Sequence, residues 1–133
     1  MIVADTNVIA YLFIPGVHTK LAEDALRRDP DWATPLLWRS EFRNVLAGYL
    51  RHKLVTFDIA LQIMEQAEGL LKKLEHSVSS FKVLELVNRS KCSAYDCEFV
   101  ALAQDLNVPL ITTGNQILNS FPEITVSLKS FTQ

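Results

Sequence analysis

The chain opens with an apolar run, MIVADTNVIAYLF, that an aspartate interrupts at position 5. Residues 2–4 are typical of a short buried strand, and an ionised carboxylate beside such a strand is costly unless it is paired or bound to a cation. In an open parallel sheet the carboxyl ends of the strands form the crevice where ligands bind. Asp5 is therefore a candidate functional residue, and a turn-forming acid after a strand is the simpler alternative.

Strand-like segments alternate with amphipathic helical segments along the whole chain. Helices are expected over residues 18–28, from Pro35 to about residue 52 behind Thr34 as N-cap, and over residues 57–74, 80–89 and 94–106, the first and last of these behind Thr56 and Ser93 as N-caps. Further strands are expected at residues 32–34, 108–112 and 124–128. The apolar run resumes at residues 8–13 and ends at Pro15-Gly16. This alternation predicts an α/β fold with a mainly parallel sheet.

Length and composition narrow the class of protein. The 133 residues, 49% of them hydrophobic and 21% charged, fit one globular domain over residues 1–133. No stretch approaches the roughly 18 apolar residues of a membrane span, and there is no basic start or cleavage site of a signal peptide. We therefore expect a cytoplasmic protein with no membrane partner. Cys92 and Cys97 have no Cys or His cluster around them, so neither a zinc site nor a disulfide framework is expected.

The net charge of −2 lacks the basic footprint of a protein that binds nucleic acid by charge alone. Contact with a phosphate backbone would therefore need the help of bound cations.

Helical spacing places two further acids near buried faces. In the helix that ends near residue 52, Glu41 lies roughly 40° from Val45 on the core stripe, at 100° per residue. In the helix over residues 94–106, Asp96 lies about 20° from Ala103 on its core stripe. Three acids gathered on inner faces would repel one another unless a cation lay among them. Mg²⁺ suits such a set, because it is held by a few carboxylates together with water and substrate phosphate.

Two of these acids also have structural alternatives. Asp96 stands three residues after Ser93, where it can serve the helix N-terminus. Glu41 can lie at the edge of its helix and reach solvent. The joint placement of the three acids is harder to explain in structural terms than any one of them.

Four segments resemble the PIN domain, and specifically the VapC-type toxins of toxin–antitoxin pairs: VADTNVI at 3–9, SEFRNVL at 40–46, SAYDCEFVALA at 93–103 and PLITTG at 109–114. In this order and spacing they cover nearly the whole chain. The resemblance implies a three-layer sandwich, with a central mainly parallel sheet flanked by helices. It also implies a metal-dependent ribonuclease that leaves a 5′-phosphate and a 3′-hydroxyl.

The same resemblance implies a set of site residues. Asp5, Glu41 and Asp96 match the acids that hold Mg²⁺ or Mn²⁺ in such proteins, and Asn7 and Thr112 would line the site through hydrogen bonds. Asn44, one turn after Glu41 on its helix, adds a polar neighbour.

This sequence departs from the family pattern at one position. Family members commonly carry an aspartate two residues after the threonine that Thr112 matches, and here that residue is Gly114. Asn115 is adjacent and offers an uncharged amide oxygen. Glu98 is not expected to replace the missing acid. We therefore expect one firm metal site, and a second that is weak or forms only with substrate phosphate.

The expected reaction is hydrolysis of RNA phosphodiester bonds by water that the metal positions. Arg39 and Arg43 point away from Glu41 on their helix and are not expected to touch the scissile phosphate. Candidates for an RNA-facing rim, with plain solvation as the alternative, are Arg51, Lys53, Arg89 and Lys91. Trp38 and Tyr49 are expected in the core, and Tyr95 is a candidate for base stacking. The resemblance further implies a homodimer and a cognate antitoxin whose C-terminal segment covers the acidic cleft.

Other functions remain open. A PIN-like module that has lost a metal ligand could bind RNA or protein without cleaving RNA, and Gly114 favours that alternative. An aspartyl-phosphate phosphatase would use Asp5 as its nucleophile, but Asn7 occupies the second acid of the usual D-x-D pattern. A dinucleotide-binding domain is disfavoured because no G-x-G-x-x-G follows the first strand.

Overall fold

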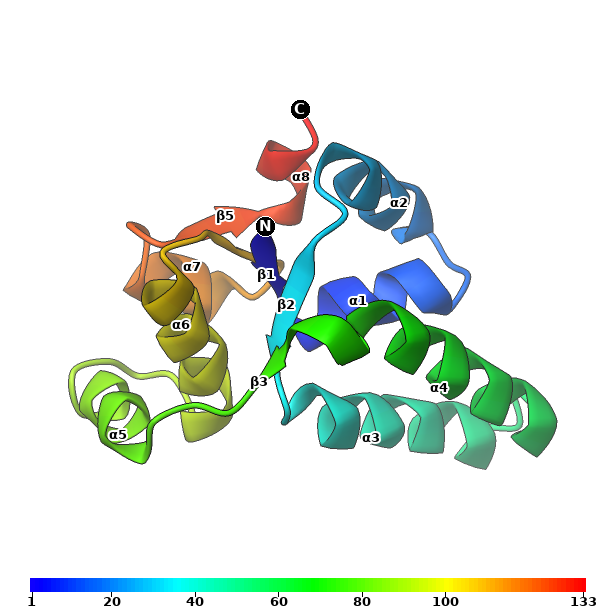
Figure 1. The fold of residues 1–133 in the computed structure, drawn as a ribbon. Helices are drawn as coiled ribbons and strands as arrows, with labels where there is room; N and C mark the ends of the chain where they lie inside the picture. Colours follow the sequence, from blue (N-terminus) through cyan, green and yellow to red (C-terminus); the bar gives the residue numbers. More distant parts are fainter.

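The computed structural model describes residues 1–133 and has a five-stranded parallel sheet at its centre (Figure 1). The strands are β1 (Ile2–Ala4), β2 (Trp32–Pro35), β3 (Glu75–His76), β4 (Leu110–Thr112) and β5 (Thr125–Ser127), in the order β3-β2-β1-β4-β5. In the middle of the sheet, Val3 of β1 pairs with Ala33 of β2 on one side and with Leu110 of β4 on the other. The predicted parallel sheet is confirmed.

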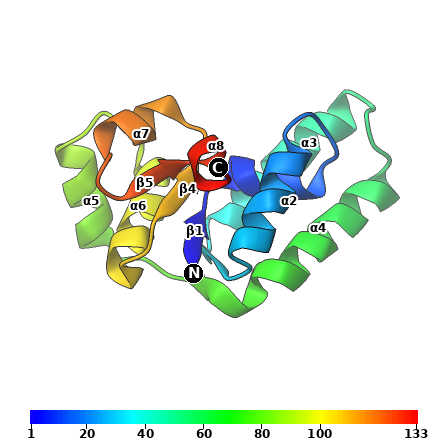
Figure 2. The same ribbon diagram turned by 90° about the horizontal axis from the view of Figure 1, so that it is seen from above.

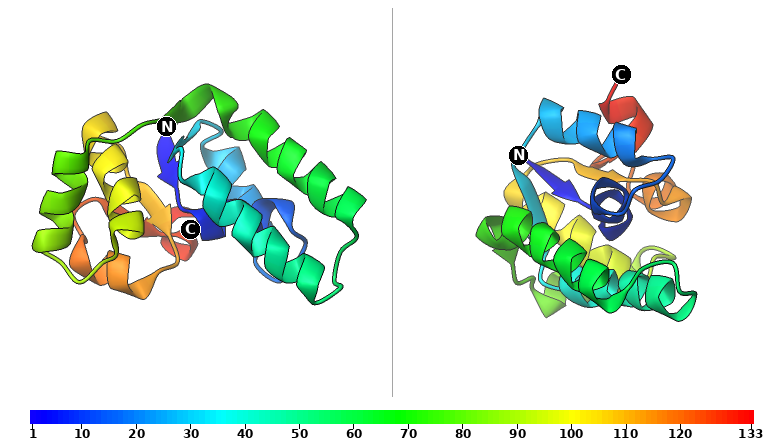
Figure 3. Two further views of the ribbon diagram at one scale, coloured as in Figure 1. Left: turned by 90° about the horizontal axis from the view of Figure 1, so that it is seen from below. Right: turned by 90° about the vertical axis from the view of Figure 1, so that its right-hand side faces the viewer.

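Helices cover the sheet in two groups. They are α1 (Thr6–Phe13), α2 (Thr19–Arg28), α3 (Trp38–Arg51), α4 (Phe57–Leu71), α5 (Ser80–Asn88), α6 (Ala94–Leu106), α7 (Asn115–Ser120) and α8 (Leu128–Phe131). Figures 2 and 3 show α5, α6 and α7 together on one side and α1 to α4 on the other. This arrangement is the predicted three-layer sandwich. None of the helices combines the length and apolar character needed to cross a membrane.

The predicted start of α3 at Pro35 is wrong. Pro35 is the last residue of β2, and α3 begins three residues later at Trp38. The cause is the short strand β3, which pairs with Thr34 and Pro35 and keeps both in extended conformation. The N–H of Leu36 then donates to the carbonyl of His76, which closes the pairing.

The other predicted caps are confirmed. Thr56 accepts a hydrogen bond from the N–H of Ile59 at the start of α4, and Ser93 accepts one from Asp96 at the start of α6. The helix α4 ends at Leu71 and is followed by a 3₁₀ turn at Lys72–Leu74, a segment that was expected to belong to the same α-helix. No helix or strand predicted from the sequence corresponds to β3, α1, α7 or α8.

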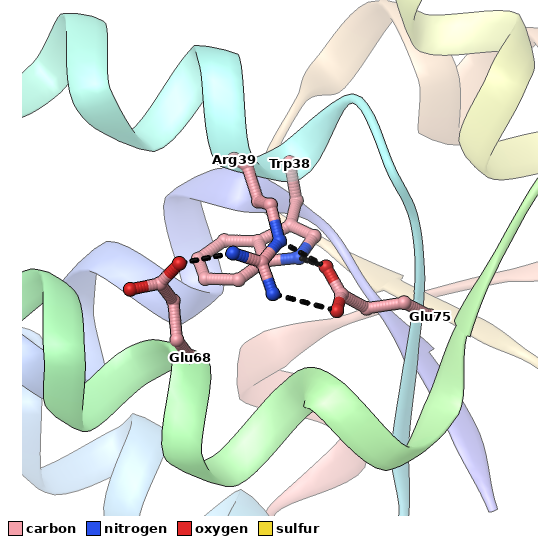
Figure 4. Close-up of polar contacts among 4 residues, drawn as sticks. All are labelled: Trp38, Arg39, Glu68 and Glu75. Carbon is pink, nitrogen blue, oxygen red and sulfur yellow. Dashed lines mark hydrogen bonds and ion pairs between the residues drawn. The ribbon is translucent and has the colours of Figure 1, made fainter.

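Arg39 ties the first turn of α3 to α4 and to β3 (Figure 4). Its Nε donates to Oε2 of Glu75 at 2.6 Å, its Nη2 donates to Oε1 of the same carboxylate at 2.8 Å, and its Nη1 pairs with Glu68. The indole N–H of Trp38 donates to Glu75 at 2.7 Å. The hydrogen bonds of Arg39 hold the pKa of Glu75 below its ordinary value. This cluster fixes the end of α3 that carries Glu41.

Replacing Arg39 with alanine is expected to lower the free energy of unfolding by about 2–3 kcal/mol, because Glu75 would keep its largely buried charge without its bidentate partner. Urea denaturation at neutral pH measures the change. The matched control is Arg43→Ala, whose side chain is exposed on the same helix and should change stability by less than about 0.5 kcal/mol. Equal stabilities of the two variants would contradict a structural role for the Arg39 cluster.

Candidate active site

A cleft of about 310 Å³ lies at the carboxyl ends of β1 and β4. Its walls come from the start of α1, from α3, from the start of α6 and from the β4–α7 connection. The lining residues are Asp5, Thr6, Asn7, Glu41, Asn44, Val45, Asp96, Gly114, Gln116 and Ile117. The structure therefore brings the three acids singled out in the sequence into one cleft.

Asp5 is fixed in place by the N-terminus of α1 and by β4. It is the N-cap of α1, and its Oδ1 accepts a hydrogen bond of 2.7 Å from the backbone N–H of Thr6. The hydroxyl of Thr112 donates to its Oδ2 at 2.7 Å. Burial raises the pKa of Asp5, the two hydrogen bonds partly offset this, and the charge of Asp96 adds to the rise. Asp5 is thus an oriented carboxylate whose ionised form is disfavoured where it stands.

Glu41 reaches the cleft from α3 and contacts the same turn of α1. The hydroxyl of Thr6 donates to its Oε1 at 2.6 Å. Burial raises the pKa of Glu41, the hydrogen bond from Thr6 partly offsets this, and the negative charges of Asp5, Asp96 and Glu98 raise it further. Thr6 was not predicted as a site residue. Its position directly after Asp5 was the one signal in the sequence that pointed to it.

Asp96 lies in the first turn of α6, where its backbone N–H donates to the hydroxyl of Ser93 at 3.0 Å. Burial raises the pKa of its carboxyl, and hydrogen bonding with Ser93 partly offsets the rise. Asp96 therefore serves the helix N-terminus and lines the cleft at the same time. The two interpretations of this residue are compatible.

No basic side chain neutralises the three acids. The salt bridges of the structure involve other carboxylates, namely those of Asp24, Asp29, Glu68, Glu75 and Asp105. The three carboxylates line one cleft, have raised pKa values and have no Lys or Arg partner, so they offer hard oxygen donors of the kind that suits Mg²⁺ or Mn²⁺. No group of three or more His, Cys, Asp or Glu side chains is arranged to hold a metal ion by itself. Water or substrate oxygens would have to complete the coordination.

The predicted supporting residues divide into three groups. Asn7 and Asn44 line the cleft, as does the unpredicted Gln116. Thr112 lies behind Asp5 and holds it. Asn115 is exposed at the start of α7 and is not among the lining residues.

The basic residues proposed for an RNA-facing rim do not line the acidic cleft. Arg51, Lys53, Arg89 and Lys91 are all exposed. The guanidinium of Arg89 lies over the ring of Phe121 at 5.7 Å from its centroid.

Several other side chains considered above lie outside the acidic cleft. Glu98 lines a separate pocket between β3, α5 and α6. Tyr95 is exposed, Trp38 is buried, and Tyr49 is half-buried against the core. Cys92 and Cys97 are buried free thiols.

Without divalent cations, the stability of wild type relative to Asp5→Asn should depend on pH. Because burial raises the pKa of Asp5 in the folded chain, wild type should lose stability relative to the variant as pH rises through that raised pKa. Below the ordinary pKa of an aspartate, the difference in stability between the two proteins should no longer change with pH. Urea denaturation of both proteins in EDTA between about pH 4 and pH 8 measures it. Parallel curves would show that the burial of Asp5 costs nothing.

Known proteins with a similar sequence or fold agree on one family. The sequence model of the PIN domain matches residues 2–123. Ribonuclease VapC3 from Pyrobaculum aerophilum is 28% identical over 126 residues, and the match covers 92% of this chain and 96% of that protein.

Three solved structures share the fold at 14–22% identity. PAE2754 from Pyrobaculum aerophilum matches with a TM-score of 0.78 over 98% of this chain and 85% of that chain. FitAcB from Neisseria gonorrhoeae matches with a TM-score of 0.76 over 97% of this chain and 99% of that chain. A toxin–antitoxin complex from Klebsiella pneumoniae matches with a TM-score of 0.69 over 96% of this chain and 98% of that chain. These likenesses show the fold, and the match of the family model over residues 2–123 shows that the chain belongs to the PIN domain family.

Proposed function

We propose that the chain is a metal-dependent ribonuclease that acts as the toxin of a toxin–antitoxin pair in the cytoplasm. The observation that carries the proposal is the cleft in which Asp5, Glu41 and Asp96 lie without any basic partner. The name of Ribonuclease VapC3 supports RNA as the substrate, and the toxin–antitoxin complex among the structural neighbours supports an antitoxin as a partner.

Each residue of the cleft has a role in this proposal. Asp5, Glu41 and Asp96 would hold Mg²⁺ or Mn²⁺, which when bound supplies a charge that stabilises the phosphate and lowers the pKa of the attacking water. Thr112 and Thr6 keep the first two carboxylates in fixed orientation through their hydroxyl donors. The amides of Asn7, Asn44 and Gln116 line the cleft, where they can hydrogen-bond substrate or water. The protein thus contributes orientation and negative charge, and no covalent nucleophile is required.

Cleavage of a mixed-sequence single-stranded RNA tests the proposal. Wild type with Mn²⁺ or Mg²⁺ is expected to shorten the RNA to products with 5′-phosphate ends, and EDTA or the Asp96→Asn substitution should stop the reaction. RNA that stays intact at high protein concentration with either metal would instead support the second candidate, an inert module that binds RNA or protein. Gly114, at the position of the fourth family acid, is the observation that favours this candidate.

The proposal includes two protein partners. One is a cognate antitoxin whose C-terminal segment covers the acidic cleft, and the other is a second copy of the chain. Size-exclusion chromatography with light scattering measures the molar mass in solution, which is expected to be twice 15.0 kDa for the homodimer.

A further inference from the structure

A second cleft adjoins the acidic one and has a different chemistry. Its volume is about 390 Å³, and two of its lining residues, Asn7 and Val45, also line the acidic cleft. The two clefts therefore share a wall. The second cleft lies between α1, the α1–α2 connection and α3, and no acidic residue lines it. We call it the aromatic cleft, after Tyr11, His18 and Tyr49.

These three rings come from separate parts of the chain. Tyr11 lies on α1, His18 precedes α2, and Tyr49 lies on α3. The rings of Tyr11 and His18 pack together with centroids 4.6 Å apart and planes at 43°. His18 is exposed, and both tyrosines are half-buried. The aromatic cleft thus offers flat apolar faces with polar edges, next to the amide of Asn7.

We propose that the aromatic cleft binds an unpaired nucleobase of the RNA whose phosphate lies in the acidic cleft. This inference rests on RNA being the substrate of the proposed function. Because RNA is a continuous chain, a phosphate held in one cleft places a neighbouring nucleotide at the shared wall formed by Asn7 and Val45. Bases stack on aromatic side chains whatever their sequence, since every base has a π-face.

The charges of the two clefts suit the two parts of a nucleotide. The acidic cleft attracts a phosphate only through a cation, whereas the aromatic cleft has no carboxylate that would repel the adjoining backbone. A base has a flat face, which the tyrosine and imidazole rings can contact, and a polar edge, which the Asn7 amide can contact.

The test compares two ligands with Ca²⁺ as the cation: a short single-stranded RNA of mixed sequence and an abasic ribose-phosphate chain of the same length. Fluorescence anisotropy measures both affinities. Wild type is expected to bind the base-bearing RNA about tenfold tighter, the effect of stacking one base. The double variant Tyr11→Leu/His18→Ala should bind the abasic chain as wild type does and lose most of the preference for bases.

Two single variants complete the experiment. His18→Ala changes only an exposed side chain, so it should fold normally and still lose about threefold of the preference. Phe81→Leu removes an aromatic ring that is 75% exposed on α5, a helix that contributes no residue to the aromatic cleft, and it should keep the full preference. Thermal melting monitored by circular dichroism checks that each variant is folded.

The outcomes separate the subsite from the catalytic function. A preference for bases that His18→Ala and the double variant retain would overturn the subsite, as would a wild type that binds both ligands equally. If wild type cleaves RNA and shows no preference for bases, the proposed function stands without the subsite. If no metal supports cleavage while the variants still lose the preference, the nucleobase subsite stands and the nuclease function fails.

Discussion

Replacing Asp5 with asparagine is expected to lower the rate of metal-dependent RNA cleavage by a factor on the order of a thousand. Asp5 is held at both carboxylate oxygens, one by the N–H of Thr6 and the other by the hydroxyl of Thr112. Asparagine has nearly the same size, so the wall of the cleft should keep its shape. The variant would lose one negative charge and one carboxylate oxygen, which are what a cation requires there. Initial rates on a labelled RNA over a range of Mn²⁺ concentrations measure the loss.

The matched control is Glu98→Gln, which makes the same kind of change on α6 without altering a lining residue of the acidic cleft. It should keep its rate within about threefold of wild type. If Glu98→Gln lost as much activity as Asp5→Asn, loss of any nearby negative charge would explain both results, and the specific role of Asp5 would be wrong.

Replacing Gly114 with aspartate is expected to tighten Mn²⁺ binding about tenfold, which corresponds to about 1.4 kcal/mol. Gly114 lines the acidic cleft and is the N-cap of α7 with φ −77° and ψ 115°, a conformation that aspartate adopts readily. An added Cβ would lie 3.5 Å from Oγ1 of Thr112 and 4.0 Å from Cδ1 of Ile117, which are ordinary contacts. The new carboxylate would also cap α7, which has no side-chain cap. Isothermal titration with Mn²⁺ measures affinity and stoichiometry.

The control for the added charge is Gly114→Asn, which fills the same space and caps a helix equally well. It should bind Mn²⁺ like wild type. Without metal, Gly114→Asp should be less stable than Gly114→Asn at neutral pH, because a fourth carboxylate would join three that already repel one another. Equal Mn²⁺ affinities of the two variants would show that position 114 does not face the cation.

Much of the site could be predicted from local patterns. The run of apolar residues before Asp5 predicted a strand whose end carries the acid, and helical spacing placed Glu41 and Asp96 beside core stripes. Each of these inferences uses only residues close together in sequence. The end of β1 and the first turns of α3 and α6 then meet at the edge of the sheet where the parallel strands have their carboxyl ends.

The remaining features depend on contacts between distant segments. The hydroxyl of Thr6 reaches Glu41, 35 residues away, and no local pattern marks such a pair. The strand β3 consists of Glu75 and His76 alone, and two polar residues carry no strand pattern, although their pairing shifts the start of α3 from Pro35 to Trp38.

The helix α7 was missed because it has six residues and is too short for a clear hydrophobic period. Its rotation determines which amide faces the acidic cleft. Gln116 lines the cleft and Asn115 does not, which the sequence could not decide.

The proposed nuclease activity requires that Asp5, Glu41 and Asp96 together hold one divalent cation. Soaking crystals of wild type in Mn²⁺ and collecting anomalous diffraction data tests it most directly. One strong anomalous peak is expected within about 2.5 Å of oxygens from these carboxylates, with water completing the coordination. Anomalous peaks found only elsewhere on the protein, with the three carboxylates unchanged, would contradict it.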